Sequence, residues 1–126
     1  MESLEYLLTR LSADQTNYIN YIKPLILAEE LQIPHVISVI DTKSTWYYQI
    51  HPERYVPALR DWCPVTEKEI TVFESTACLQ YLAERHDADG LWNGRNPAEK
   101  AAVLSWTAYQ TAGLGYALQP WFSGPS

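Results

Sequence analysis

Residues 56–61 read Val-Pro-Ala-Leu-Arg-Asp, and residues 70–82 read Ile-Thr-Val-Phe-Glu-Ser-Thr-Ala-Cys-Leu-Gln-Tyr-Leu. Pro57 belongs at the start of a strand or at a bend, because proline has no N–H to donate to a sheet, and its peptide bond is a candidate for the cis form. The β-branched run that opens the second segment predicts another strand. After Ser75 the apolar residues recur at helical spacing. This part of the chain therefore predicts, in order, a strand, a hairpin, a strand and a helix.

The start of the predicted helix offers a place for a charged ligand. The backbone N–H groups near Ser75 and the helix dipole favour an anion, and Glu74 beside them would accept a cation. Val56 would add backbone donors and acceptors if a cis bond at Pro57 turned its backbone outward. Together these groups suit the zwitterionic head of an amino acid joined to a peptide backbone. The alternative is that Ser75 only caps the helix and Glu74 only complements its dipole.

The order of these motifs resembles the glutathione-binding domain of glutathione S-transferases, which has a thioredoxin-like fold. Residues 46–57, which read Trp-Tyr-Tyr-Gln-Ile-His-Pro-Glu-Arg-Tyr-Val-Pro, are similar to the W-x-x-x-x-N-P-x-x-x-[VI]-P run of that family. His51 replaces the usual Asn there, and we interpret it as structural. The resemblance extends to about Leu118 and is closest to the fungal branch that includes the yeast nitrogen-regulator prion protein. It implies that glutathione is bound by Val56, Pro57, Glu74 and Ser75.

The first part of the chain supplies the remaining elements of such a fold. The resemblance implies that residues 4–11 form the first strand, although their apolar pattern would also suit a helix, and the β-branched residues 35–41 predict the second strand. Polar residues 12–20 are expected to form a loop, and the helix is expected to begin near Pro24, since proline is favoured at the first helical position. The resemblance implies an α/β domain with a mixed four-stranded sheet, and residues 62–69 are expected to form a hairpin insert between its last two strands.

The resemblance also implies a group that activates the thiol of glutathione in the loop before the first helix. A hydroxyl or amide donor there would lower the thiol pKa from its usual value of roughly 8.5. The fungal motif P-N-G-x-K places Asn20 at the Asn position when counted back from Lys23. Counting forward from the first strand instead favours Asn17 or Ser12. The alternative is that these polar residues only form turns.

Two residues after the second strand are candidates for holding the glycine carboxylate of glutathione. Lys43 would attract it by charge, and Thr42 would donate a hydroxyl. The alternative for Lys43 is a solvated loop lysine. The three histidines have no metal-ligand spacing with the cysteines, so no metal site is expected.

Composition excludes several classes of function. The net charge of −6 argues against nucleic acid, and no apolar run approaches the roughly 20 residues of a membrane span. Cys63 and Cys78 form neither a disulfide framework nor a redox pair, and the N-terminus lacks a secretion signal, so a cytoplasmic location is expected. Cys63 is expected to be partly exposed, with only Lys68 nearby to favour its thiolate.

The last part of the chain predicts one more helix. Asn96 is expected to cap it, with Pro97 and Glu99 in its first turn. Apolar residues then recur at Ala102, Trp106, Tyr109 and Gly113. The resemblance implies a glutathione-binding domain at 1–88, then a linker and the first helix of a truncated all-helical domain at 89–126. The exposed apolar face predicts a homodimer.

Three functions follow from the resemblance. The first is a transferase that activates the glutathione thiolate and adds it to a small electrophile. The second is a glutathione-dependent cis–trans isomerase of a conjugated alkene in fungal secondary metabolism. The third is a non-catalytic module that binds glutathione or a protein and regulates.

Overall fold

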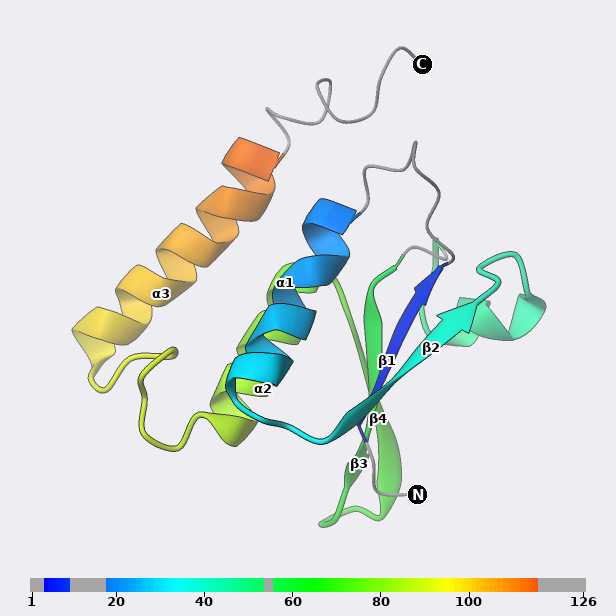
Figure 1. Cartoon of the computed structure of the whole chain (residues 1–126), viewed down its shortest axis with the longest axis horizontal. Helices are drawn as coiled ribbons and strands as arrows, with labels where there is room; N and C mark the ends of the chain where they lie inside the picture. The colour runs from blue at the N-terminus through cyan, green and yellow to red at the C-terminus, as the bar shows by residue number, and fades with distance from the viewer. Residues whose placement is uncertain (1–3, 10–17, 54–55, 116–126) are drawn as a thin grey trace.

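The computed structural model describes residues 4–9, 18–53 and 56–115. One sheet carries two packed helices on one face, and a third helix lies outside them (Figure 1). The elements are β1 (Leu4–Thr9), α1 (Tyr18–Glu30), β2 (His35–Ile40), the 3-10 helix η1 (Thr45–Gln49), β3 (Ala58–Cys63), β4 (Lys68–Phe73), α2 (Ser75–His86), α3 (Pro97–Tyr109) and the π-helical turn η2 (Gln110–Gly115).

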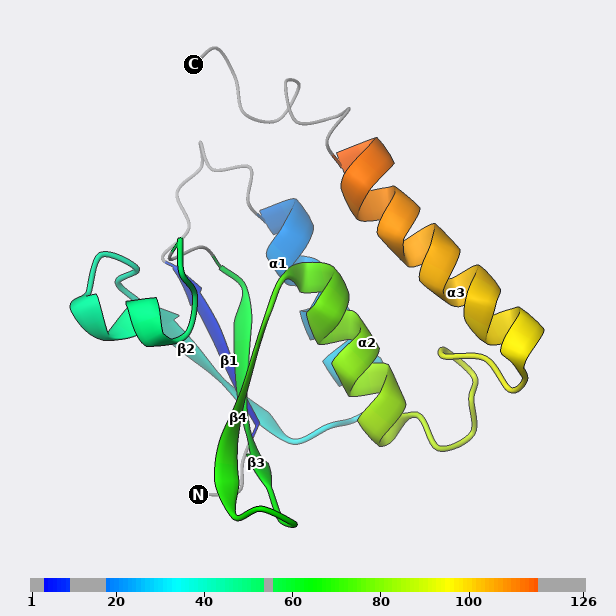
Figure 2. The same cartoon turned by 180° about the vertical axis from the view of Figure 1, so that it is seen from behind.

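The sheet is mixed and has the strand order β2-β1-β3-β4. β1 is parallel to β2, whereas β3 is antiparallel to both β1 and β4. The strands β1, β2 and β4 therefore finish at the same edge, where β3 starts. Both α1 and α2 begin at this edge, which we call the carboxyl end of the sheet (Figure 2).

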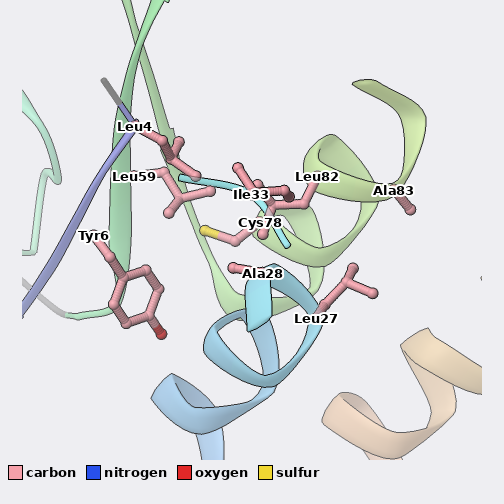
Figure 3. Packing of buried hydrophobic residues seen from close by; sticks show 9 residues of the cluster. All are labelled: Leu4, Tyr6, Leu27, Ala28, Ile33, Leu59, Cys78, Leu82 and Ala83. Atoms are coloured by element: carbon pink, nitrogen blue, oxygen red, sulfur yellow. The ribbon is translucent and has the colours of Figure 1, made fainter. Parts of the chain in front are cut away.

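The main core lies between the sheet and the helices α1 and α2. Alternation along β1 sends Leu4 and Tyr6 to the helix face and Leu7 to the opposite face. The helices contribute buried residues at spacings of four, such as Cys78 and Leu82. The core cluster comprises Leu4, Tyr6, Leu27, Ala28, Ile33, Leu59, Cys78, Leu82 and Ala83 (Figure 3).

A smaller cluster covers the opposite face near the carboxyl end of the sheet. It is formed by Leu7, Tyr47, Ile50 and Ala58. Tyr47 and Ile50 come from η1 and the residue after it, so this short helix closes the face that α1 and α2 leave uncovered.

The prediction that the first helix begins near Pro24 is wrong, because α1 already includes Tyr18 and Pro24 lies inside it. An interior proline costs about 3 kcal/mol, since it removes the hydrogen bond to the carbonyl four residues earlier. Here the ring of Pro24 is almost completely buried, and this apolar burial offsets the loss.

The hairpin between the last two strands is tighter than the predicted insert. β3 continues to Cys63 and β4 begins at Lys68, and these two residues face each other in the ladder. The turn is closed by the N–H of Glu67, which donates to the carbonyl of Cys63 at 2.8 Å. Strand pairing satisfies the backbone groups of the flanking residues, so only the four residues between the strands are left to form the turn.

The start of α3 has the predicted cap. The side chain of Asn96 accepts the N–H of Glu99 at 2.9 Å, and the Glu99 carboxylate accepts the N–H of Arg95 at 2.8 Å. No described residue of α3 is buried. Within the described ranges, no helix is long and apolar enough to cross a membrane.

Candidate functional site

The two motifs that the sequence singles out meet at the carboxyl end of the sheet. The ladder between β3 and β4 finishes with Ala58 opposite Phe73. One step further along the two chains come Pro57 on one side and Glu74 on the other. The segment before β3 and the start of α2 therefore leave the sheet at the same level.

The segment before β3 has the predicted backbone geometry. The peptide bond between Val56 and Pro57 is cis. Pro57 is buried, and Val56 is half-buried against the cluster around Tyr47. The position of Val56 is thus fixed from the opposite face of the sheet.

The start of α2 combines an exposed carboxylate with uncapped backbone donors. Ser75 is the first residue of the helix and is only 4% exposed. Glu74 is exposed, has φ 76° and ψ 127°, and does not cap the helix with its side chain. Free N–H groups at a helix start favour an anion, and the carboxylate beside them favours a cation. The arrangement suits a zwitterion.

Thr42 and Lys43 lie beyond the end of β2, and therefore at the same end of the sheet. Thr42 is half-buried and Lys43 is exposed. The N–H of Lys43 donates to the carboxylate of Asp41 at 2.9 Å, which fixes the turn. Two strands separate this turn from the start of α2.

The candidates for thiol activation are only partly described. Asn17 and Ser12 lie outside the described residues, and so does the side chain of Asn20. The backbone of Asn20 is the third residue of α1, so its predicted place in a loop is wrong. The cause is again the burial of Pro24, which lets the helix extend toward its N-terminus. α1 nevertheless begins at the carboxyl end of the sheet (Figure 1).

His51 has the structural role expected of it. It is buried, and its Nδ1 accepts the N–H of Glu53 at 3.0 Å in the turn that contains Pro52. Its ring also lies against Phe73, with centroids 4.5 Å apart. The histidine thus joins the turn before Val56 to the end of β4.

A polar cluster near the start of α2 was not predicted. The Lys23 ammonium donates to Gln110 Oε1 at 2.6 Å and to Thr111 Oγ1 at 3.0 Å. The hydroxyl of Thr111 also bonds the hydroxyl of Thr76 at 2.5 Å. Burial lowers the pKa of Lys23. The sequence signals nothing of this cluster beyond the place of Lys23 in the fungal motif, since the groups come from three elements far apart in the chain.

Neither cysteine belongs to the site. Cys78 lies in the core, where burial raises the pKa of its thiol to about 12. Cys63 lies at the opposite end of the sheet, and hydrogen bonds from the hydroxyl of Thr66 and from nearby backbone lower its pKa. The expectation that only Lys68 favours this thiolate is therefore wrong. The described residues contain no group of His, Cys, Asp and Glu that could hold a metal.

Comparison with known proteins points to one family. The family described as "Glutathione S-transferase, N-terminal domain" matches residues 21–85. The chain is 67% identical over 111 residues to "Glutathione S-transferase aclG" of Aspergillus oryzae, which covers 88% of this chain and 50% of that protein. It is 71% identical over 103 residues to the "Trimodular acetylaranotin synthesis protein ataIMG" of Aspergillus terreus, which covers 82% of this chain and 12% of that protein. The chain thus spans half, or less, of the length of these relatives.

A solved structure has the same fold. "Ure2p in complex with glutathione" superimposes with a TM-score of 0.75 at 20% identity, covering 99% of this chain and 53% of that one. The thioredoxin-like α/β fold is thereby confirmed.

Proposed function

Because the chain belongs to the glutathione S-transferase family, we propose that it binds glutathione at the carboxyl end of the sheet and activates its thiolate for addition to a small electrophile. One observation carries this proposal. The register of β3 and β4 brings the cis-proline segment level with the uncapped start of α2. The backbone of Val56, which can pair with a peptide, then lies next to the start of α2, which can bind a zwitterion. We call the start of α2, with Glu74 and Ser75, the corner of the site.

The corner holds the γ-glutamyl head of glutathione. Its carboxylate accepts hydrogen bonds from the first turn of α2 and from the hydroxyl of Ser75. Its ammonium pairs with the exposed carboxylate of Glu74. The backbone of Val56, next to Pro57, pairs with the peptide of the cysteinyl residue in the manner of an added strand.

The glycine end of glutathione lies toward Thr42 and Lys43. Three strand spacings of about 4.8 Å separate β4 from β2, which makes roughly 14 Å. An extended tripeptide spans about 10 Å. The long side chain of Lys43 covers the remaining distance, so glutathione bridges the two candidate sites across the sheet.

Activation of the thiol is assigned to the start of α1. The amide of Asn20, with Asn17 as the second candidate, donates a hydrogen bond to the glutathione sulfur and favours the thiolate. The dipole of this helix start acts in the same direction, because a negative charge is favoured there. When bound, glutathione supplies the sulfur that bonds to the electrophilic carbon, and its proton passes to solvent.

The name of one of the two relatives favours a biosynthetic reaction. One is called a glutathione S-transferase and the other an acetylaranotin synthesis protein. This context also suits the second candidate, a glutathione-dependent isomerisation, in which the sulfur leaves again after bond rotation.

We assign residues 1–88 to the glutathione-binding domain and 89–126 to the linker and the start of a helical domain. A homodimer in the cytoplasm stays a prediction.

Calorimetric titration with glutathione tests the proposal. We expect a dissociation constant between micromolar and millimolar for the parent, and at least about tenfold weaker binding for Ser75→Ala and for Glu74→Gln, because each loses a charge-assisted contact. Ser105→Ala is the matched control, since Ser105 is exposed on α3. Absence of binding by the parent would refute the proposal.

A second experiment separates the reactions. The parent is incubated with glutathione and chlorodinitrobenzene, and the product is examined by mass spectrometry. A transferase gives the conjugate with loss of chloride, and Asn20→Ala slows it. If the parent binds glutathione but conjugates neither this nor other electrophiles, the transferase function is refuted. The isomerase and the non-catalytic module are then the two candidate functions.

A further inference from the structure

The segment after α3 is attached to the starts of the first two helices by a small polar bridge. Gln110 and Thr111, just after α3, make hydrogen bonds to Lys23 of α1 and Thr76 of α2. Since α3 has no described buried residue, apolar packing contributes little to its position. The bridge therefore links the end of α3 to the helices α1 and α2.

The chemistry of the bridge is complete at Thr111. A threonine hydroxyl has one hydrogen to donate and two lone pairs to accept with. Thr111 Oγ1 accepts from the ammonium of Lys23, shares a hydrogen bond with the hydroxyl of Thr76 and donates to Gln110 Oε1 at 3.3 Å. It thus joins α1, α2 and the π-helical turn at a single atom.

The π-helical turn is what places these groups. Gln110 and Thr111 are its first two residues, and they follow Val103 and Thr107 on the less exposed side of the helix. Single π turns widen a helix locally and are frequent at functional sites. Here the turn directs two consecutive side chains toward the starts of α1 and α2.

The bridge reaches the glutathione anchor through Thr76. This residue follows Ser75 in the first turn of α2, and Lys23 follows Asn20 by one turn of α1. We propose that Lys23, Thr76 and Thr111 are positioning residues, which couple the docking of the π-helical turn to the binding of glutathione at the start of α2. This inference rests on the proposed function. The bridge fixes the first turn of α2, whose N–H groups must point at the ligand, and the bound ligand in turn holds the π-helical turn in place.

The charge of Lys23 supports this view. Its ammonium is half-buried, and its two bonds within the bridge are to neutral oxygens. Burial of a cation is unfavourable unless hydrogen bonds compensate, so loss of Thr111 or Gln110 should release the lysine to solvent. The bridge is therefore expected to open as a unit.

Calorimetric titration with glutathione tests the coupling. Thr111→Val keeps the size of the side chain and removes the hydroxyl. We expect it to weaken glutathione binding about three- to tenfold, since the hydrogen bonds of the Thr111 hydroxyl to Lys23 and Thr76 are lost. Thr111→Ser restores the hydroxyl and should bind as the parent does. The double variant that combines Thr76→Val and Thr111→Val should bind glutathione as well as whichever single variant binds it more weakly. The two substitutions should not add, because each breaks the same bridge.

Thr107→Val is the matched control. Thr107 lies one turn earlier, and its hydroxyl bonds only the carbonyl of Val103 at 2.6 Å within α3. It should leave glutathione binding unchanged. If the parent binds glutathione and Thr111→Val binds equally well, the coupling is refuted while the proposed function stands. If Thr111→Ser fails to restore binding, loss of packing explains the effect and the inference is again refuted. If the parent does not bind glutathione, both the proposed function and the coupling are refuted.

Discussion

At the scale of single residues, Glu74 is the position where the proposed function and the stability of the fold conflict. Its φ of 76° is rare for a residue with a side chain, and such a conformation costs on the order of 1–3 kcal/mol. Glycine adopts it without strain but loses more entropy on folding. A residue that keeps this strain next to a predicted ligand site is expected to be there for the ligand.

Glu74→Gly should therefore change stability and binding in opposite directions. We expect the free energy of unfolding to rise by about 1 kcal/mol in urea titration, because strain is relieved. We expect glutathione affinity to fall about tenfold, because the carboxylate is lost. Gln32→Gly is the control. Gln32 also has a positive φ, of 54°, where it ends α1 far from the site, so it should gain stability and keep its affinity. If Glu74→Gly bound glutathione as tightly as Gln32→Gly and the parent, Glu74 would not hold the ligand.

The two thiols should differ sharply in reactivity. Hydrogen bonds from Thr66 and its backbone neighbours lower the pKa of Cys63, so more of it is thiolate at a given pH. Cys78 is buried, with a pKa raised to about 12. Iodoacetamide should therefore modify Cys63 in the folded protein and Cys78 only after unfolding, as peptide mass spectrometry would show. Thr66→Val should move the alkylation profile of Cys63 to higher pH, and an unmoved profile would contradict the assigned cause.

At the scale of elements, a polar network holds α2 on β3. The hydroxyl of Tyr81 donates to Asp61 at 2.6 Å, and Arg85 donates to the same carboxylate at 2.9 Å and to the carbonyl of Trp62 at 3.0 Å. Burial, together with the hydrogen bond to Asp61, raises the pKa of Tyr81 to about 12. The helix that carries the proposed glutathione site is thus tied to the strand that follows the cis-proline.

This network predicts a loss of stability in alkaline solution. A tyrosine whose pKa is raised in the folded state contributes fully to the free energy of unfolding below pH 10, the ordinary tyrosine pKa. This contribution is lost as the pH rises toward about 12. The urea midpoint should therefore fall over this range, and Tyr81→Phe should flatten the fall. The decline should persist in part, since the buried Tyr47 also has a pKa raised to about 12. Tyr109→Phe, on the exposed face of α3, should leave the slope unchanged. An identical slope in Tyr81→Phe would contradict the role of the network.

The elements show which features a sequence reveals. The second strand, the start of α2, the cap of α3 and the cis-proline depend on patterns within a few residues, and all were predicted correctly. The first strand was predicted from the resemblance, and the strand ends at the hairpin were missed. The start of α1 was predicted wrongly, because whether proline is tolerated inside a helix depends on how deeply its ring is buried, which only tertiary structure decides. The bridge at Thr111 could not be predicted either, because it joins residues 88 positions apart, which only the tertiary structure brings together. Whether Asn20 or Asn17 meets the thiol stays a prediction.

At the scale of the whole molecule, α3 presents an aromatic face that the described chain does not cover. Trp106 is 70% exposed and packs edge-to-face on Tyr109, at 5.8 Å between centroids, and Tyr109 is itself 51% exposed. Contiguous apolar surface of this kind is uncommon on monomers. The net charge of −6 opposes association between copies, and salt screens that repulsion.

We therefore expect the chain to self-associate through α3, and to do so more strongly as salt is added. Sedimentation velocity over a concentration series should show a dimer that Trp106→Glu converts to monomer, because a charge cannot be buried in the contact without a large cost. Ala108→Glu adds the same charge at an exposed position of α3 on the side away from Trp106 and should weaken the dimer much less. A parent that remains monomeric at all salt concentrations would show that the aromatic face does not bind a second copy. A dimer that both variants preserve would place the contact on another surface.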